Sequence, residues 1–206
     1  MKYTGPKFKL CRREQTDLFG SPKYNIKKNR NLPGQHGASM QRYSEYGKLL
    51  RNKQLLKRSY LLTEKQFSKI VKDTAAKYSK NNGIAHDVAL FQFLERRFDS
   101  IVYRAGFAKT MMQARQMVNH AHFILNGTKH NIPSTFLKQG DKILLKEKLQ
   151  KSGLYENNIL NYKGKLPSRI KINKTELSIE VLNVPQHGEI GTPADLIKVI
   201  EFYARA

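Results

Sequence analysis

The sequence predicts an α+β protein in which a helical N-terminal domain carries a basic extended arm and is followed by a unit of two helices and a small antiparallel sheet. Three observations support this fold class. Apolar residues recur at helical spacing between residues 43 and 97. Residues 95–148 combine two short helical patterns with short strand-like runs and tight turns. Residues 1–45 are rich in lysine, arginine, glycine and proline and show hardly any apolar periodicity.

The chain is therefore divided into five segments, and the first is the least regular. The segments are a basic arm at 1–45, a helical bundle at 46–94, a compact module at 95–148, a linker with strands at 149–191 and a last helix at 192–205. The arm cannot bury much of itself and is predicted to order on a partner. Its turn at residues 33–37 (PGQHG) either brings its backbone close to a phosphate or is an ordinary solvated loop.

The charge balance limits the kind of partner. The 206 residues include 38 basic and 16 acidic side chains, which gives a net charge of +22, and the first 94 residues hold 20 of the basic and only 6 of the acidic ones. So large an excess predicts binding to nucleic acid or to an anionic membrane. The sequence has no apolar run near the roughly 20 residues that span a bilayer and no secretory signal, and it has one cysteine, so we expect a soluble intracellular protein.

Three helices are predicted in the bundle. In the first, at residues 43–60, the apolar stripe is Leu49, Leu50, Leu56 and Tyr60, and the outward side chains are Lys48, Arg51, Lys53, Lys57 and Arg58. The tyrosines here, Tyr43, Tyr46 and Tyr60, suit either base stacking or core packing. The second helix begins at the capping pair Thr63 and Gln66 and runs to Asn81-Asn82-Gly83, and the third covers residues 86–97.

The module at 95–148 has the most specific pattern. Its first helix stops at Gly106, because glycine readily adopts the left-handed conformation that closes a helix. Thr110 is the predicted N-cap of the second helix, with Gln113 three positions on. The second helix turns Ala114, Met117 and Val118 inward and leaves Gln113, Arg115, Gln116, Asn119 and His120 on the other faces.

Short strands complete the module. A run at residues 122–125 leads into Asn126-Gly127, a strong hairpin signal, and the turn at 139–141 precedes a second apolar run at 143–145. Arginine and amide side chains then lie beside a tight turn. This combination suits a sugar-phosphate backbone, because the arginine fork matches phosphate oxygens.

The C-terminal part is predicted to be simpler. Residues 149–168 are interpreted as a connection, and the alternating residues around 170–172 and 177–181 as two half-buried strands. Thr192-Pro193 is expected to open the last helix. Its predicted apolar side consists of Leu196, Ile197, Ile200 and Tyr203. This helix is nearly neutral, so we expect it to dock on protein.

The module also resembles a known one. It contains in order Arg97-Phe-Asp99, Tyr103-Arg104-x-Gly106-Phe107, Thr110-x-x-x-Ala114-Arg115-Gln116-x-Val118-x-His120 and Asn126-Gly127. This string resembles the small RNA-binding module named after the fourth protein of the small ribosomal subunit. Similar strings of that ribosomal protein family are Gly5-Pro6-Lys7, Cys11-Arg12-Arg13-Glu14, Asp17-Leu18-Phe19, Pro33-Gly34-Gln35-His36-Gly37, Ser44-x-Tyr46-Gly47 and Glu64-Lys65-Gln66-Phe67. The resemblance therefore covers nearly the whole chain.

The resemblance implies a structural constituent of the small ribosomal subunit. Such a protein would bind the 5′ domain of small-subunit ribosomal RNA (rRNA) early in assembly, contact the fifth small-subunit protein, lie by the channel through which messenger RNA (mRNA) enters, and influence decoding accuracy. It would be cytoplasmic, with no homo-oligomer expected. In the family the module is inserted in the helical domain, and the final helix packs back on the N-terminal helices.

Two features depart from the family. Many members carry a zinc-binding cysteine cluster in the arm, whereas here Cys11 is alone and Phe8 occupies a cluster position, so we expect no zinc and no cofactor. His120 and His122 lack the further ligands that a metal site needs. Met111-Met112 stands where the family usually has at least one arginine, and Lys109 is expected to compensate.

The predicted RNA-contacting residues lie in both halves of the chain. In the first half they are Arg12, Arg13, Gln35, His36, Arg51, Lys53, Lys57 and Arg58. In the module they are Arg97, Arg104, Lys109, Thr110, Gln113, Arg115, Gln116, Asn119, His120 and Asn126. For Arg97 the alternative is an ion pair with Asp99 or Glu95, and for Gln113 a cap alone. Arg115 has no acid at helical spacing, which favours RNA.

No enzyme is predicted. The sequence contains no glycine-rich phosphate loop with Lys and Ser/Thr, no nucleophile elbow and no acidic set for two magnesium ions. The alternatives are an RNA-modifying enzyme, or a ribosome-recycling or stress factor, that carries the same module. An enzyme would need a separate catalytic domain, whereas the flanks of the module are a basic arm, a small bundle and a short tail.

Overall fold

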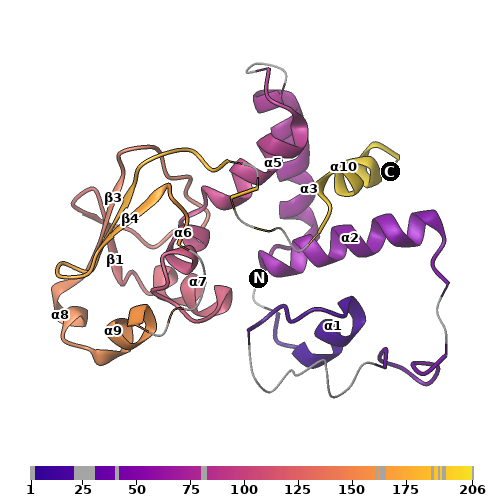
Figure 1. Ribbon diagram of the computed structural model, residues 1–206, viewed down its shortest axis with the longest axis horizontal. Helices are drawn as coiled ribbons and strands as arrows, with labels where there is room; N and C mark the ends of the chain where they lie inside the picture. Colours follow the sequence, from indigo (N-terminus) through magenta and orange to yellow (C-terminus); the bar gives the residue numbers. More distant parts are fainter. Residues whose placement is uncertain are drawn as a thin grey trace. The chain divides into compact units, whose positions relative to one another are not determined.

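The computed structural model forms two compact units (Figure 1). The first unit comprises residues 1–90 and 192–206, and the second comprises residues 91–191. The residues that the structure describes are 3–20, 31–39, 42–79, 83–160, 162, 166–186, 188–189, 191 and 194–205. No helix among them is long and apolar enough to cross a bilayer.

The first unit is helical. Its elements are α1 (Lys7–Glu14), α2 (Glu45–Ser59), α3 (Glu64–Asp73), the π-helical continuation η2 (Thr74–Ser79), the start of α5 (His86–Glu95) and α10 (Leu196–Arg205). Ser44 caps α2 by accepting a hydrogen bond from the Gly47 N–H. The capping pair predicted for α3 is confirmed, because Thr63 and Gln66 each accept a hydrogen bond from the other's backbone N–H.

The N-terminal arm is more folded than its composition suggests. Cys11 on α1 is fully buried, Phe19 is 6% exposed, and α1 packs against α2. In the loop at residues 31–39 the Leu32 N–H donates a hydrogen bond to the Gly37 carbonyl. A Cβ on Gly37 would lie 1.8 Å from the Leu32 carbonyl oxygen, so only glycine fits at this position. Among the described residues of the arm, however, only Cys11, Phe19 and Pro33 are buried, so the prediction that the arm buries little of itself is confirmed for these parts; residues 21–30 lie outside them.

Helix α10 packs back against α2 and α3, as expected for the last helix. Its buried residues are Leu196, Val199 and Phe202, whereas Ile197 is 66% exposed. The predicted apolar side is therefore wrong for Ile197, because the residues that face α2 follow one another at intervals of three. The predicted start at Thr192-Pro193 lies outside the described residues.

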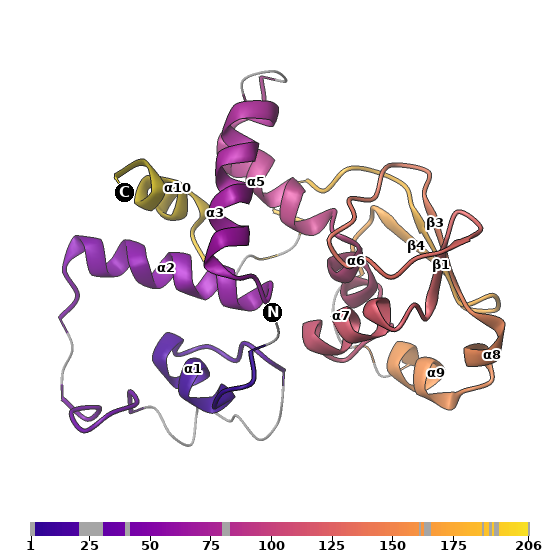
Figure 2. The same cartoon turned by 180° about the vertical axis from the view of Figure 1, so that it is seen from behind.

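The second unit is a five-stranded sheet with helices (Figure 2). Its elements are α6 (Phe98–Arg104), α7 (Met111–Asn119), β1 (Phe123–Leu125), β2 (Thr128–Lys129), β3 (Lys142–Leu145), α8 (Glu147–Gln150), α9 (Gly153–Leu160), β4 (Ile170–Asn173) and β5 (Ser178–Val181). The strand order is β2-β1-β3-β5-β4, and all neighbours are antiparallel. One sheet face packs on α6 and α7 through a common core that includes Phe98, Val118 and Ile179.

Two turns in the second unit form as predicted. Gly106 ends α6 at φ +75°, and a Cβ there would lie 2.7 Å from the Tyr162 ring. Asn126 and Gly127 both have positive φ, as a tight hairpin between β1 and β2 requires.

The predicted connection at 149–168 contains the end of α8 and the whole of α9 instead. In α9, Tyr155 is 1% exposed, and its ring packs against Phe107 and Phe123. The Asn158 side chain donates to the Phe107 carbonyl at 2.9 Å. A polar segment thus forms a helix because a few long-range contacts hold it to the core. In the same way, β4 and β5 join the module's own sheet through the β3–β5 pairing.

We predict that Phe202→Ala lowers the free energy of unfolding by about 3–5 kcal/mol, because removing a buried ring leaves a cavity. Urea denaturation of the full chain followed by circular dichroism measures this loss. Ile197→Ala on the same helix is the matched control, and its effect should stay within about 0.5 kcal/mol because the side chain is exposed. Equal losses would contradict the orientation of α10.

Candidate nucleic-acid interface

Helix α7 presents a polar face to solvent. Thr110 caps it by accepting a hydrogen bond from the Gln113 N–H at 3.2 Å, and Gln113 in turn accepts from the Lys109 N–H at 2.8 Å. Met111, Ala114, Met117 and Val118 are buried, as the helical spacing predicts for the last three. The exposed residues on α7 and at its two ends are Lys109, Gln116, Asn119 and His120. These four side chains are oriented outward because the opposite side of the helix is fixed in the core.

Asp99 on α6 determines where two arginines lie. Its side chain is 1% exposed and accepts two hydrogen bonds from Arg97, at 3.0 and 2.7 Å. The Arg115 guanidinium of α7 lies 4.0 Å from the same carboxylate and keeps 23% of its side chain exposed. Burial lowers the pKa of Arg115, an effect that Asp99 opposes.

These contacts correct two sequence expectations. Arg97 is buried against Asp99, so the ion pair given as its alternative is the observed arrangement. Arg115 does have an acidic partner, which helical spacing within α7 does not indicate because Asp99 belongs to the preceding helix. Of the two, only Arg115 keeps exposed surface for a phosphate.

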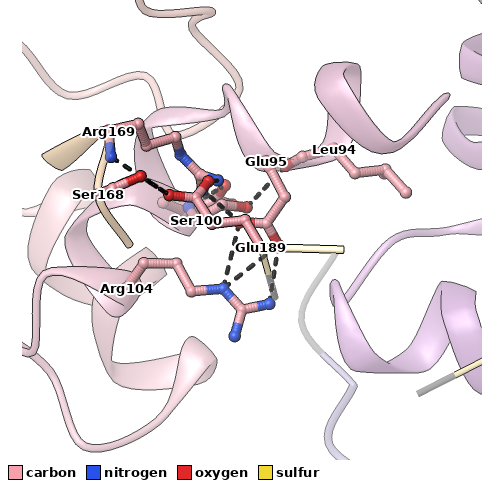
Figure 3. Close-up of polar contacts among 8 residues, drawn as sticks. Leu94, Glu95, Ser100, Arg104, Ser168, Arg169 and Glu189 are labelled. Carbon is pink, nitrogen blue, oxygen red and sulfur yellow. Dashed lines mark hydrogen bonds and ion pairs between the residues drawn. The ribbon is translucent and has the colours of Figure 1, made fainter. Parts of the chain in front are cut away.

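Glu95 forms a similar group (Figure 3). Its side chain is fully buried and pairs with Arg104 of α6 and with Arg169, each at 2.8 Å or less. Arg169, which precedes β4, also pairs with Glu189 at 3.1 Å. The Arg104 side chain is 21% exposed and that of Arg169 only 2%. No local sequence pattern indicates a role for Arg169, because its partner Glu95 lies 74 positions earlier in the chain.

Asn126 has a structural part in the hairpin. Its side chain donates to Asp141 at 2.8 Å and accepts from the Lys142 N–H at 2.9 Å. These bonds tie the tip of the β1–β2 hairpin to the turn before β3. The side chain remains exposed, so RNA contact stays a prediction.

In the first unit a third buried carboxylate organises the basic face of α2. The Glu14 side chain is 2% exposed and pairs with Arg51 at 3.1 Å and with Arg58. Burial raises the pKa of Glu14, and the charges of Arg51 and Arg58 oppose that rise. Both arginines keep about a quarter of their side chains exposed.

The two lysines on the other side of α2 are bound by Glu64. Lys53 and Lys57 each lie 2.8 Å from it, and the Tyr203 hydroxyl donates to it at 2.7 Å. The Lys53 side chain is only 7% exposed, and its ammonium lies 4.4 Å from the centre of the Phe202 ring. The expectation that Lys53 faces outward is therefore wrong, because α10 covers this part of α2.

The remaining predicted residues lie on α1 and the loop after it. Arg12 donates to the backbone carbonyls of Asn31 and Leu32, at 2.8 and 3.1 Å, and so holds the loop to the helix. Arg13 is half-buried, and Gln35 and His36 are exposed in the tight turn. The turn thus has a defined backbone, as its glycines suggested.

The structure brings the predicted residues together in two separate groups. One lies on α6, α7 and the hairpin of the second unit, and the other on α1, α2 and the loop at 31–39 of the first. Within the described residues, no three His, Cys, Asp or Glu side chains cluster in a way that would hold a metal ion. The chemistry available at both groups is therefore the binding of anions through guanidinium, ammonium and amide groups.

The Glu64 group predicts a pH effect. Partial burial raises the pKa of Glu64, but hydrogen bonds from Lys53, Lys57 and Tyr203 outweigh burial and bring the pKa to about 2, below the usual 4.5. The folded protein therefore gains stability from this carboxylate above pH about 4.5 and loses it as the pH falls towards about 2.

We expect Glu64→Gln to lose less stability than the wild type over this pH interval, measured by urea denaturation at a series of pH values. Glu147→Gln, an exposed residue of the second unit, is the control and should keep the wild-type profile. If the stability of Glu64→Gln depended on pH as that of the wild type does, the assignment of this pH effect to Glu64 would be wrong.

Comparison with known proteins identifies the family. Residues 2–95 match the family model described as the ribosomal protein S4/S9 N-terminal domain, and residues 96–143 match the S4 domain. The chain is 37% identical over 210 residues to small ribosomal subunit protein uS4A of Symbiobacterium thermophilum, with 99% of each chain covered. It is 40% identical over 204 residues to small ribosomal subunit protein uS4 of Borrelia garinii subsp. bavariensis, covering 97% of this chain and 96% of that one. The similar proteins are named as ribosomal proteins and not as enzymes. From its arm to its last helix, the chain belongs to the ribosomal protein S4 family.

Proposed function

We propose that this protein is a structural constituent of the small ribosomal subunit that binds the 5′ domain of small-subunit rRNA directly and nucleates assembly there. The observation that carries the proposal is the exposed face of α7, where Gln116, Asn119 and His120 lie next to Arg115, an arginine positioned by a buried carboxylate. Names of the similar proteins support the ribosomal role.

The physical basis of the binding is charge and shape. The chain carries a net charge of +22, and phosphate contacts release counterions from RNA. Side chains read the deep A-form major groove poorly, so selectivity requires a surface that matches a folded RNA. Arg104 and Arg115 suit this purpose because Glu95 and Asp99 restrict their side chains before RNA arrives, which lowers the entropic cost of binding.

The family resemblance supports the finer parts of the proposal. The protein acts in the cytoplasm within the ribosome, contacts the fifth small-subunit protein, lies near the channel through which mRNA enters, and contributes to translational accuracy. It makes and breaks no covalent bond. Helix α10, which is nearly neutral, packs on α2 and α3 and is expected to serve as a protein contact.

Arg115→Ala should weaken binding to a transcript of the 5′ domain of small-subunit rRNA by about tenfold or more, because a hydrogen bond to a charged group contributes roughly 1.5–3 kcal/mol. Filter binding measures the affinity, and circular dichroism verifies that the variant is folded. The matched control is Lys171→Ala, which removes one exposed charge from β4. A folded Arg115→Ala variant with wild-type affinity would refute the assigned face.

The arm should account for much of the salt dependence. Replacing Lys23, Lys27, Lys28 and Arg30 by glutamine should reduce the slope of log affinity against log salt by about 0.7–0.9 for each phosphate that the arm no longer neutralises. The charge-matched control replaces four exposed lysines of α3 and α10 by glutamine: Lys65, Lys69, Lys72 and Lys198. An unaltered slope in the arm variant, or an equal change in both, would show that the arm does not bind phosphates.

A further inference from the structure

The first unit contains a cleft of about 610 Å³ between α1, the loop after it and α2. Its size falls within the range of roughly 300–1,000 Å³ that is usual for small-molecule sites. Its lining combines four cations and two rings with apolar residues and a glycine: Lys9, Arg13, Arg51, Arg58, Tyr3, Tyr43, Pro6, Leu10, Pro33, Leu50 and Gly47. All of them belong to one compact unit, in which α1 packs beside α2.

The charge in the cleft is not balanced. None of the described residues that line it is acidic, and Glu14, which pairs with Arg51 and Arg58, offsets one of four positive charges. The Arg58 side chain is only 22% exposed, so its guanidinium is already partly removed from water, and this burial lowers its pKa. An anion that enters the cleft would therefore meet guanidinium groups whose desolvation has been offset in part by Glu14.

The two tyrosine rings that line the cleft indicate a ligand that has more than an anionic group. Tyr3 is 42% exposed and Tyr43 is 41% exposed, so each ring keeps free surface. Glycines support both rings: a Cβ on Gly5 would lie 2.6 Å from the Tyr3 hydroxyl, and a Cβ on Gly47 would lie 3.5 Å from the Tyr43 ring. Exposed rings beside cations are the combination on which unstacked bases of RNA bind.

We propose that this cleft takes one unstacked nucleotide of RNA, with its phosphate among Arg13, Arg51 and Arg58 and its base against Tyr43. Inorganic phosphate would use the cations alone, whereas a nucleotide uses both walls. The inference rests on the proposed function, since it makes the cleft a specific contact within the RNA complex. Glu14 acts as a positioning residue, because it pairs with Arg51 and Arg58, which both line the cleft.

The first experiment titrates the ¹⁵N-labelled full chain with adenosine 5′-monophosphate, adenosine or inorganic phosphate and follows backbone amide shifts by NMR. We expect the monophosphate to shift the signals of Arg13, Gly47 and Arg51 at lower concentration than inorganic phosphate does. Adenosine alone should bind more weakly than the monophosphate, because it lacks the charge. Equal affinity for the monophosphate and inorganic phosphate would overturn the proposal and leave an anion site without base recognition.

The second experiment uses tyrosine variants. Tyr43→Ala should weaken monophosphate binding about fivefold or more, which corresponds to the lower end of base–aromatic stacking, and leave phosphate binding unchanged. Tyr43→Phe should restore nucleotide binding, because the ring suffices for stacking. Tyr46→Ala is the matched control: this exposed tyrosine of α2 packs on Phe202 and does not line the cleft. If Tyr43→Ala and Tyr46→Ala lost equal affinity for the monophosphate, the proposed contact between the base and the Tyr43 ring would be refuted.

The same variants separate this inference from the proposed function. With the 5′-domain transcript, we expect Tyr43→Ala to bind more weakly than Tyr46→Ala in a filter assay. If Tyr43→Ala binds like the wild type while Arg115→Ala is impaired, the cleft proposal fails and the proposed function stands. If the wild-type chain itself ignores the transcript, the proposed function fails.

Discussion

The structure depends on the burial of carboxylates between pairs of arginines. Glu14, Glu95 and Asp99 have side chains no more than 2% exposed, and each contacts two guanidinium groups. A chain with a net charge of +22 cannot bring its helices together without neutralising the arginines at their contacts. Removing one partner of a buried pair leaves an uncompensated charge, which typically costs about 3–5 kcal/mol.

The same pairs link stability to RNA binding. In the second unit each carboxylate holds one buried arginine, Arg169 or Arg97, and one that reaches the surface, Arg104 or Arg115. Arg169 joins parts of the chain 74 residues apart, whereas Arg97 pairs with Asp99 two residues away, and in both groups the exposed arginine is held in place for an anion. Because both functions share one carboxylate, a substitution at Glu95 or Asp99 would alter folding and binding together. In the first unit, Glu14 also holds two arginines, but both Arg51 and Arg58 keep exposed surface.

Much of the local structure could be predicted from residue patterns. The capping pair at Thr63, the inward face of α7, the end of α6 at Gly106 and the hairpin at Asn126-Gly127 all form as expected. Each depends on interactions within a few residues, which neighbouring side chains and backbone preferences decide. The same patterns predicted the residues that contact RNA. Most of those that are exposed in the structure lie on or beside α7 and in the turn at 33–37.

The sequence by itself determined the basic character of the protein, the order of most of its helices and strands, and the polar face of α7, because charge, helical spacing and turn chemistry are local properties. Only the tertiary structure decided that α9 is a helix, that β4 and β5 complete the sheet, and that Lys53 is buried against Glu64 and the last helix. It also decided that Arg169 meets Glu95. These features result from contacts between residues far apart in the chain, and the free energy of burying a charge depends on which distant partner neutralises it.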